Sequence, residues 1–275
     1  MQTLLSVMDK GDPLSYIDKL NIRTDTIIIN QCGREDDRLE EHRIAGTGGA
    51  FERTGAEAVT RIRVIERDEK GLSRSRNLAL EKADDDICIF CDNDIRYEDD
   101  APDIIERAFE RNPEAGIICF FIERPERHRP VRSTEGKMSK KDMMRIFSPE
   151  IAVRRSRLKG LKFNEEFGAG AKYMMGEENI FLFDALRQGI DRVYVPCRIA
   201  GTLPNESSWF NGYDKRFFYN RGAGYEAMDA GLWHILSWQF IIRKRKLYKD
   251  TISAGEAYRA MKEGRKSYLE QEVGK

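Results

Sequence analysis

The stretch ICIFCDNDIRY, residues 87–97, joins an apolar run to a short acidic cluster. The run from Ile87 to Cys91 favours a strand that is buried on both faces, as strands of parallel sheets flanked by helices are. Ligands of such sheets bind beyond the carboxyl ends of the strands. The stretch therefore predicts a ligand site at Asp92, Asn93 and Asp94.

Strand and helix patterns alternate around this stretch. Apolar or β-branched runs predict strands at residues 3–8, 26–30, 63–66, 87–91, 116–122, 148–158 and 192–196. Mixed polar and apolar patterns predict helices at residues 13–22, 73–83, 99–112 and 177–189, followed by an aromatic-rich helical tail. This order predicts an α/β fold with an open, mostly parallel, Rossmann-like sheet. Residues 123–145, rich in charge and containing two prolines, are predicted to form a long mobile surface loop.

The composition narrows the class of protein. Lys and Arg together number 47, as do Asp and Glu, so the chain lacks the positive field of a nucleic-acid-binding protein. The five cysteines show no repeated spacing and favour a reduced, cytoplasmic compartment. No stretch approaches the roughly 18 continuous apolar residues of a membrane-spanning helix. We expect no nucleic-acid partner, and a protein that is cytoplasmic or lies on a membrane surface.

Asp92 and Asp94 are two residues apart, so an extended backbone would direct both carboxylates to one point and Asn93 away from it. Two such charges need a cation, and oxygen ligands suit Mg²⁺ or Mn²⁺, which complete their shell with substrate phosphates and water. A solvated acidic turn is the alternative. An EF-hand loop is excluded, because it needs Asp or Asn where Arg96 stands and Gly where Tyr97 stands. A haloacid-dehalogenase-type phosphatase is disfavoured, because its D-x-D usually follows the first strand.

The helix predicted at residues 73–83 has an anion-friendly beginning. Gly71 allows a sharp turn, Ser73 is a suitable N-cap, and Arg74 and Arg76 add positive charge to the free N–H groups of the first turn. A phosphate or a carboxylate could bind there. An ordinary capped helix with solvated arginines is the alternative.

The third segment is FGAGAKYMMG, residues 167–176, which leads into Glu177, Glu178 and Asn179. A flexible glycine-rich segment is able to fold over a ligand and present a carboxylate as general base. Acidic residues in a first helical turn are also stabilised by the helix dipole alone, which is the structural alternative.

Taken together, the motifs G-L-S-R-S-R-N at 71–77, D-N-D at 92–94 and G-E-E-N at 176–179 resemble, in order and spacing, those of family 2 glycosyltransferases with the GT-A fold. The resemblance covers roughly residues 3–215 and is nearest to bacterial enzymes that build capsular, exopolysaccharide or O-antigen chains. It implies a catalytic domain at residues 1–215 and a helical C-terminal extension at residues 216–275.

The resemblance also implies roles for individual residues. The reaction would be an inverting transfer from a nucleotide-sugar, most readily a UDP-sugar, to a hydroxyl of a saccharide or lipid-linked acceptor, with Mn²⁺ or Mg²⁺. Asp92 and Asp94 match the metal-binding D-x-D, and Glu178, or its neighbour Glu177, matches the catalytic Asp of the E-D motif. The donor-binding candidates are Asp92, Asn93, Arg74, Arg76, Asn77, Asp68, Asn30 and Asp9, and the acceptor-binding candidates are Trp209 and Tyr173.

Two departures from the family pattern concern these roles. The base is Glu rather than Asp, which leaves the choice between Glu177 and Glu178 open. The first strand runs into Met8-Asp9-Lys10-Gly11 rather than Pro-x-Tyr-Asn, so the residues that hold the base and ribose are open too. Trp209 could stack on an acceptor sugar, with a core aromatic cluster as the alternative.

Two other functional classes remain. A metal-dependent sugar nucleotidyltransferase would also use paired carboxylates, but normally carries a glycine-rich basic loop where MDKGDP, residues 8–13, stands. A non-catalytic nucleotide-sugar-binding protein is the other.

Within residues 232–246, an apolar, Trp-bearing segment precedes Arg243-Lys244-Arg245-Lys246, a composition typical of a helix lying in a membrane surface. A helix packed on the catalytic domain, or a dimer contact, is the alternative.

Overall fold

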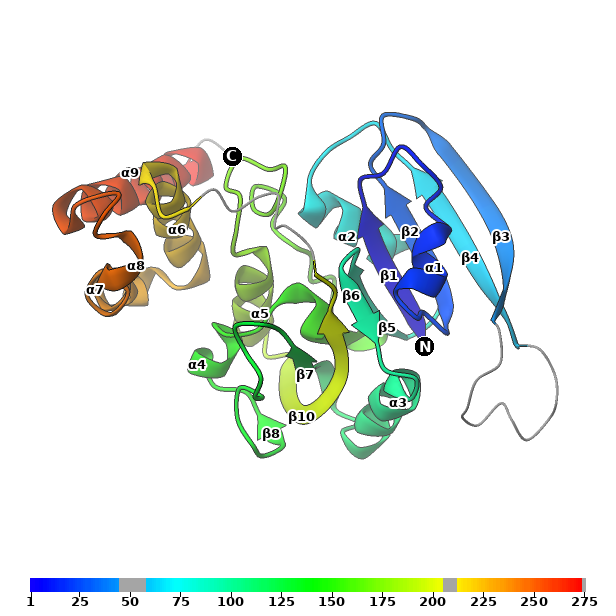
Figure 1. The fold of residues 1–275 in the computed structure, drawn as a ribbon. Helices are drawn as coiled ribbons and strands as arrows, with labels where there is room; N and C mark the ends of the chain where they lie inside the picture. The colour runs from blue at the N-terminus through cyan, green and yellow to red at the C-terminus, as the bar shows by residue number, and fades with distance from the viewer. Residues whose placement is uncertain (45–57, 205–211, 274–275) are drawn as a thin grey trace.

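The computed structural model describes residues 1–44, 58–204 and 212–273. In these residues ten strands form one sheet in the order β3-β4-β2-β1-β5-β9-β7-β10-β6, with β8 paired to β10 (Figure 1). The strands are β1 (Gln2–Val7), β2 (Asp25–Asn30), β3 (Asp36–Ile44), β4 (Ala58–Glu66), β5 (Ile87–Asp92), β6 (Ile95–Tyr97), β7 (Ala115–Glu123), β8 (Gly136–Lys137), β9 (Ile151–Arg154) and β10 (Asp191–Thr202).

The central strands β4, β2, β1 and β5 run parallel, and β7 runs parallel to β10. Side chains that alternate along these strands enter two apolar clusters, one on each face: Leu4 and Ile27 on one, Leu5 and Ile28 on the other. Helices cover both faces, as the continuous apolar runs predict. The predicted α/β sheet is thereby confirmed.

The helices divide between the two faces and a C-terminal group. The helices α1 (Ser15–Lys19) and α3 (Ala101–Arg111) cover one face, and α2 (Leu72–Lys82), α4 (Lys140–Met143) and α5 (Glu177–Arg187) the other. The C-terminal group follows as α6 (Lys215–Met228), α7 (Trp233–Arg243), α8 (Arg245–Tyr248) and α9 (Ala254–Val273) (Figure 1). The expected helical C-terminal region is present. No helix of the described residues is long and apolar enough to cross a membrane.

Three strands, β3, β6 and β8, were not predicted, and one is shorter than predicted. The edge strand β3 reads DDRLEEHRI and lacks an apolar run, because it pairs antiparallel with β4 at the margin of the sheet, where polar side chains stay in solvent. The short strand β6 directly follows the D-N-D. The strand expected over residues 148–158 is confined to β9, with a 3₁₀ turn on either side.

The prediction of a mobile loop at residues 123–145 is wrong. The segment contains β8 and α4, and it buries Val131, Met138 and Met143 in the core. The Val131 N–H donates to the Tyr194 hydroxyl at 3.0 Å, which fixes the segment to β10. The prediction failed because these buried apolar residues are widely spaced among charged residues and form no apolar run.

The C-terminal helices share an apolar core with one face of the sheet. The apolar cluster on one face of the sheet extends from Phe167 and Tyr173 to Trp233 and Met261. The Arg187 guanidinium of α5 donates to the Ala227 carbonyl of α6 at 3.1 Å. We retain the boundary between residues 215 and 216 as a proposal.

The helices α6 and α9 cross in close contact at two glycines. A Cβ on Gly264 would overlap the backbone carbonyl of Tyr219, and a Cβ on Gly222 would overlap the backbone of Met261. Backbone atoms cannot yield as the tip of a flexible side chain would, so a methyl group at either position must push the two helices apart.

We expect Gly264→Ala to lower the free energy of unfolding by about 1–3 kcal/mol, measured by urea denaturation. The matched control is Gly255→Ala in the same helix, where nothing lies within 4 Å of the added methyl group. Because Ala is the better helix former, the control should be neutral or stabilising by up to about 1 kcal/mol. Equal stability of the two variants would contradict the close crossing.

Candidate active site

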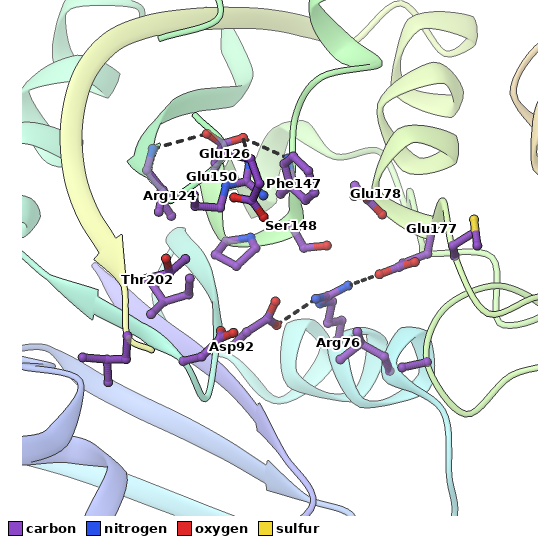
Figure 2. A pocket seen from close by; sticks show the side chains of 18 of the residues that line it. Arg76, Asp92, Arg124, Glu126, Phe147, Ser148, Glu150, Glu177, Glu178 and Thr202 are labelled. Carbon is purple, nitrogen blue, oxygen red and sulfur yellow. Dashed lines mark hydrogen bonds and ion pairs between the residues drawn. The ribbon is translucent and has the colours of Figure 1, made fainter. Parts of the chain in front are cut away.

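Arg76 joins the three sequence motifs. Its side chain is only 1% exposed and reaches from the second turn of α2 to the carboxyl ends of the strands. One guanidinium nitrogen, Nη2, donates to Oδ1 of Asp92 at 2.8 Å, and the other, Nη1, donates to Oε1 of Glu177 at 2.9 Å (Figure 2). A buried guanidinium needs such partners, because an unpaired charge in the interior is costly.

The glycine-rich segment, residues 167–176, packs on the start of α2. The Leu72 N–H donates to the Ala169 carbonyl at 2.9 Å, and the Ser73 hydroxyl donates to the Phe167 carbonyl at 2.7 Å. The expectation that Ser73 caps the helix is therefore wrong: Gly71 is the N-cap residue, and Ser73 lies inside the first turn. Its hydroxyl fixes the segment that leads to Glu177.

A cavity of about 460 Å³ opens beside this junction. Asp92, Asp94, Glu177 and Glu178 all line it. Figure 2 shows Asp92 on one side of Arg76 and the two glutamates on the other. Arg76 also lines it, and the remaining walls come mainly from residues 122–126, 147–150, 174–176 and 202–204. The cavity thus brings the D-N-D and G-E-E-N carboxylates to one site.

The D-N-D forms a turn rather than a continued strand. Asp92 ends β5, and β6 begins at Ile95, so Asn93 and Asp94 connect two strands. Burial and the negative charge of Asp92 raise the pKa of Asp94. A cation between the two carboxylates would relieve this repulsion. Two carboxylates suit Mg²⁺ or Mn²⁺, which take their other ligands from phosphates and water.

No group of three or more Asp, Glu, His or Cys side chains able to hold a metal occurs in the described residues. The two carboxylates of Asp92 and Asp94 are oxygen donors that fit a hard divalent ion, and they do not fit a closed structural zinc site.

The two glutamates at the start of α5 differ in environment. Glu177 is buried and paired with Arg76, whereas Glu178 is half-buried and lines the cavity without an ion pair in the described part of the chain. Burial, followed by the negative charge of Glu177, raises the pKa of Glu178 well above its ordinary value. A carboxyl group with a raised pKa is suited to accept a proton near neutral pH.

The match to a known family agrees with this arrangement. Residues 53–187, which contain all three motifs, match the family model described as glycosyl transferase family 2. This segment belongs to glycosyl transferase family 2. The family supports glycosyl transfer as the class of reaction. The chain has no match among curated protein sequences.

Two solved structures resemble the fold over nearly the whole chain. A TarS fragment from S. aureus in complex with UDP-GlcNAc superimposes with a TM-score of 0.58 and 12% identity, over 98% of this chain and 92% of the fragment. The mannosyltransferase PcManGT from Pyrobaculum calidifontis in complex with GDP-Man and Mn²⁺ gives 0.50 and 14%, over 96% and 73%. At such identities the likeness concerns the fold, and it confirms the predicted GT-A architecture.

Several lining residues of this family 2 site were not predicted. The Arg124 guanidinium lies 3.2 Å from the ring centroid of Phe147, and its Nη2 is 3.8 Å from a carboxylate oxygen of Glu150. Glu150 is fully buried, pairs with Arg127, and accepts the Phe147 N–H at 2.9 Å. Burial lowers the pKa of Arg124 and raises that of Glu150. Arg124 lies in the segment that was predicted to be a mobile loop. The local sequence S-P-E at residues 148–150 does not mark Glu150 as a site residue.

Two predicted donor-side residues of α2 face away from the cavity. The Asn77 amide donates to the Phe163 carbonyl at 3.0 Å and accepts the Phe163 N–H at 2.8 Å, so it fixes a neighbouring segment of the chain. Arg74 is half-exposed and pairs with Glu165 at 3.4 Å. Neither residue lines the cavity.

The other donor candidates lie at the same edge of the sheet, outside the cavity. The Asn30 side chain is hydrogen-bonded to both the N–H and the carbonyl of Asp9 at 2.9 Å. Asp9 accepts the Tyr16 hydroxyl at 2.8 Å, and Asn93 also lies beside this hydroxyl. The backbone of Asp68 donates to Glu35. These residues therefore form the rim of β1, β2 and β4, where we retain them as candidates for the nucleoside.

Tyr173, the acceptor candidate within the described residues, does not line the cavity. Tyr173 is fully buried and stacks on Phe167 with ring centroids 4.9 Å apart, and its hydroxyl bonds to that of Ser267 at 3.2 Å. It packs between the glycine-rich segment and α9, so its side chain is not available to a sugar. Trp209 lies outside the described residues.

Proposed function

We propose that the protein is a metal-dependent, inverting glycosyltransferase. It moves a sugar from a nucleoside diphosphate to a hydroxyl of a saccharide or lipid-linked acceptor, in the synthesis of a cell-surface polysaccharide. The observation that carries the proposal is the Arg76 junction, which holds Asp92 and Glu177 on one guanidinium and thereby fixes Asp94 and Glu178 on one cavity. A cytoplasmic location is part of the proposal, and the five free cysteines support it.

The proposed chemistry assigns different roles to the two glutamates. Glu177 is paired with Arg76, and it positions Glu178. Glu178 takes the proton of the acceptor hydroxyl as the oxygen attacks the anomeric carbon from the face opposite the diphosphate. The bond from this carbon to the diphosphate oxygen breaks, and the configuration of the sugar inverts.

The donor diphosphate belongs beside Asp92 and Asp94. Mg²⁺ or Mn²⁺ bound there would neutralise the negative charge of the diphosphate. Arg124 supports this placement from the protein, because its guanidinium interacts electrostatically with both Asp94 and Glu178. Its Nε atom has no hydrogen-bond partner in the described structure, and it is therefore a candidate donor to the diphosphate or the sugar.

Calorimetric titration of UDP, GDP and CMP, each with and without Mn²⁺, tests the donor site. We expect one nucleotide to bind only with Mn²⁺, and Asp94→Asn to weaken this binding at least about tenfold, because the variant loses a charged ligand. Asp250→Asn, an exposed position in the C-terminal helices, is the matched control.

Two outcomes would count against the proposed site. If wild type and Asp94→Asn bind the nucleotide with equal affinity, the metal does not bind at the D-N-D. If no nucleotide binds, the cavity is not a donor site. Nucleotide release from UDP- and GDP-sugars separates an enzyme from a binding protein. Binding without release, across a panel of acceptors, would favour the non-catalytic reading.

A further inference from the structure

The helix α7 has two apolar faces. One is buried, and the other is exposed apart from the stacking of Trp238 on Tyr258 of α9, with ring centroids 4.6 Å apart. Trp233, Leu236 and Ile241 are buried against the other C-terminal helices, and the Trp233 indole donates to the Gly222 carbonyl at 2.8 Å. On the opposite side Ile235 is 63% exposed, Trp238 47% and Ile242 68%. Their spacing of three and four residues places them in one stripe along the helix.

Positive charge lies directly beside this stripe. Arg243, Lys244, Arg245 and Lys246 are all exposed, and none of them has an ion pair in the described residues. Some cations elsewhere in the same helical group are paired, such as Lys215 with Glu263 at 3.0 Å and Lys266 with Glu270 at 3.6 Å. The chain has no acidic residue between Asp229 and Asp250. The unpaired cations therefore lack a counter-charge within their own surface.

The helix α8 holds these groups in place. The Tyr248 hydroxyl donates to the Ile241 carbonyl at 2.6 Å, and the Tyr248 ring packs edge-on against Phe218 with centroids 4.9 Å apart. Leu247, next to Tyr248 in α8, is a further exposed apolar side chain at 49%. The stripe and the cations form one fixed surface, the α7–α8 surface, made of Ile235, Trp238, Ile242, Leu247 and residues 243–246.

We propose that the α7–α8 surface binds the face of a bilayer that contains anionic phospholipids. Exposed aliphatic and Trp side chains enter the boundary between headgroups and acyl chains, and adjacent Lys and Arg meet the lipid phosphates. The charge pattern disfavours a second copy as occupant, because a two-fold contact at this surface would place its cations near those of the partner.

The position of the surface in the fold gives the contact a consequence. The helix α7 packs on α6, and α6 is joined to α5, which carries Glu177 and Glu178 (Figure 1). Binding through α7–α8 would therefore hold the cavity in one orientation relative to the bilayer. This consequence rests on the proposed function, since it matters for a lipid-linked acceptor. The lipid contact itself does not depend on catalysis.

Sedimentation with vesicles tests the proposal. The full chain should bind vesicles of phosphatidylcholine with phosphatidylglycerol, should bind phosphatidylcholine alone much more weakly, and should dissociate at high salt. Lys244→Glu with Arg245→Glu should lower the affinity at least about tenfold, because it reverses two lipid-facing charges. Ile235→Ser with Ile242→Ser should also lower it, with less dependence on salt.

Matched controls separate the surface from net charge and from misfolding. Lys215→Glu with Lys266→Glu makes the same change in charge elsewhere on the helical group and should keep most of the affinity. Thermal unfolding verifies that each variant is folded. Trp238 fluorescence should shift to shorter wavelength with anionic vesicles, and Trp238→Phe should remove the shift.

Absence of binding to the anionic vesicles, or equal losses in the control and the α7–α8 variants, would overturn the proposal. Sedimentation velocity tests the competing occupant: a wild-type dimer that becomes a monomer in Ile235→Ser with Ile242→Ser would identify a protein contact instead. Nucleotide titration of the same variants keeps this result distinct from the proposed function, because donor affinity should be unchanged in all of them.

Discussion

Glu178→Gln is expected to lower the rate of sugar transfer about 10²–10⁴-fold, the range that a general base typically contributes. The amide keeps the size of the side chain but does not accept the acceptor proton. Because Glu178 and Asp92 line the cavity on opposite sides of Arg76 (Figure 2), nucleotide affinity in the presence of Mn²⁺ should stay close to that of wild type. Steady-state kinetics together with nucleotide titration measure the two effects separately.

The pH dependence follows from the raised pKa of Glu178. The base acts in its ionised form, so kcat/KM should fall as the pH drops through that pKa, at a higher pH than for an ordinary carboxyl group. Glu177→Gln removes the neighbouring negative charge and leaves the Arg76 charge less neutralised. Both changes lower the pKa of Glu178, so the acid limb should move to lower pH in this variant.

Stability provides the control for Glu178→Gln. A carboxyl group whose pKa is raised by folding binds more protons in the folded state, so it makes the protein less stable as pH rises above its ordinary pKa. Gln carries no such penalty, and the variant should be at least as stable as wild type at alkaline pH. Retained turnover in a folded Glu178→Gln protein would show that another group is the base, with Glu177 the next to test.

The sheet could be predicted because its strands are buried on both faces. Continuous runs such as ICIFC mark β5, and residues that follow such runs necessarily gather at one edge of a parallel sheet. The positions of Asp92 and Asp94 on the cavity follow from this alone. The resemblance to family 2 glycosyltransferases assigned residues of α2 and α5 to one catalytic site, although no local pattern shows that Arg76 contacts both carboxylates.

The remainder of the site depends on contacts between distant segments. Arg124 and Glu150 meet because β9 inserts antiparallel between β5 and β7, which neither sequence neighbourhood indicates. Tyr173 has an aromatic ring that could stack on a sugar, but α9, about a hundred residues later in the chain, covers it. Exposure of an aromatic ring is decided by tertiary packing, which a local motif does not contain.

Arg76→Met is expected to lower the free energy of unfolding by about 3–5 kcal/mol, the typical cost of removing one partner from a buried ion pair. Met has a similar length and no charge, so the loss comes mainly from leaving Glu177 and Asp92 without a cation. Urea denaturation measures it. Arg74→Met, two residues earlier in the same helix, removes only a half-exposed pair with Glu165 and should cost about 1 kcal/mol or less.

If unpaired carboxylates cause the loss of stability in Arg76→Met, the loss should depend on pH. Without the guanidinium the carboxylates of Glu177 and Asp92 lack a counter-charge, and acidic pH removes their charge, so the difference in stability between wild type and the variant should narrow at low pH. Adding Glu177→Gln and Asp92→Asn to Arg76→Met should likewise recover part of the loss, because no buried charge then remains unpaired. A deficit that is constant with pH and unchanged in the triple variant would mean that Arg76 stabilises the fold through packing on Phe163 rather than through its two carboxylates.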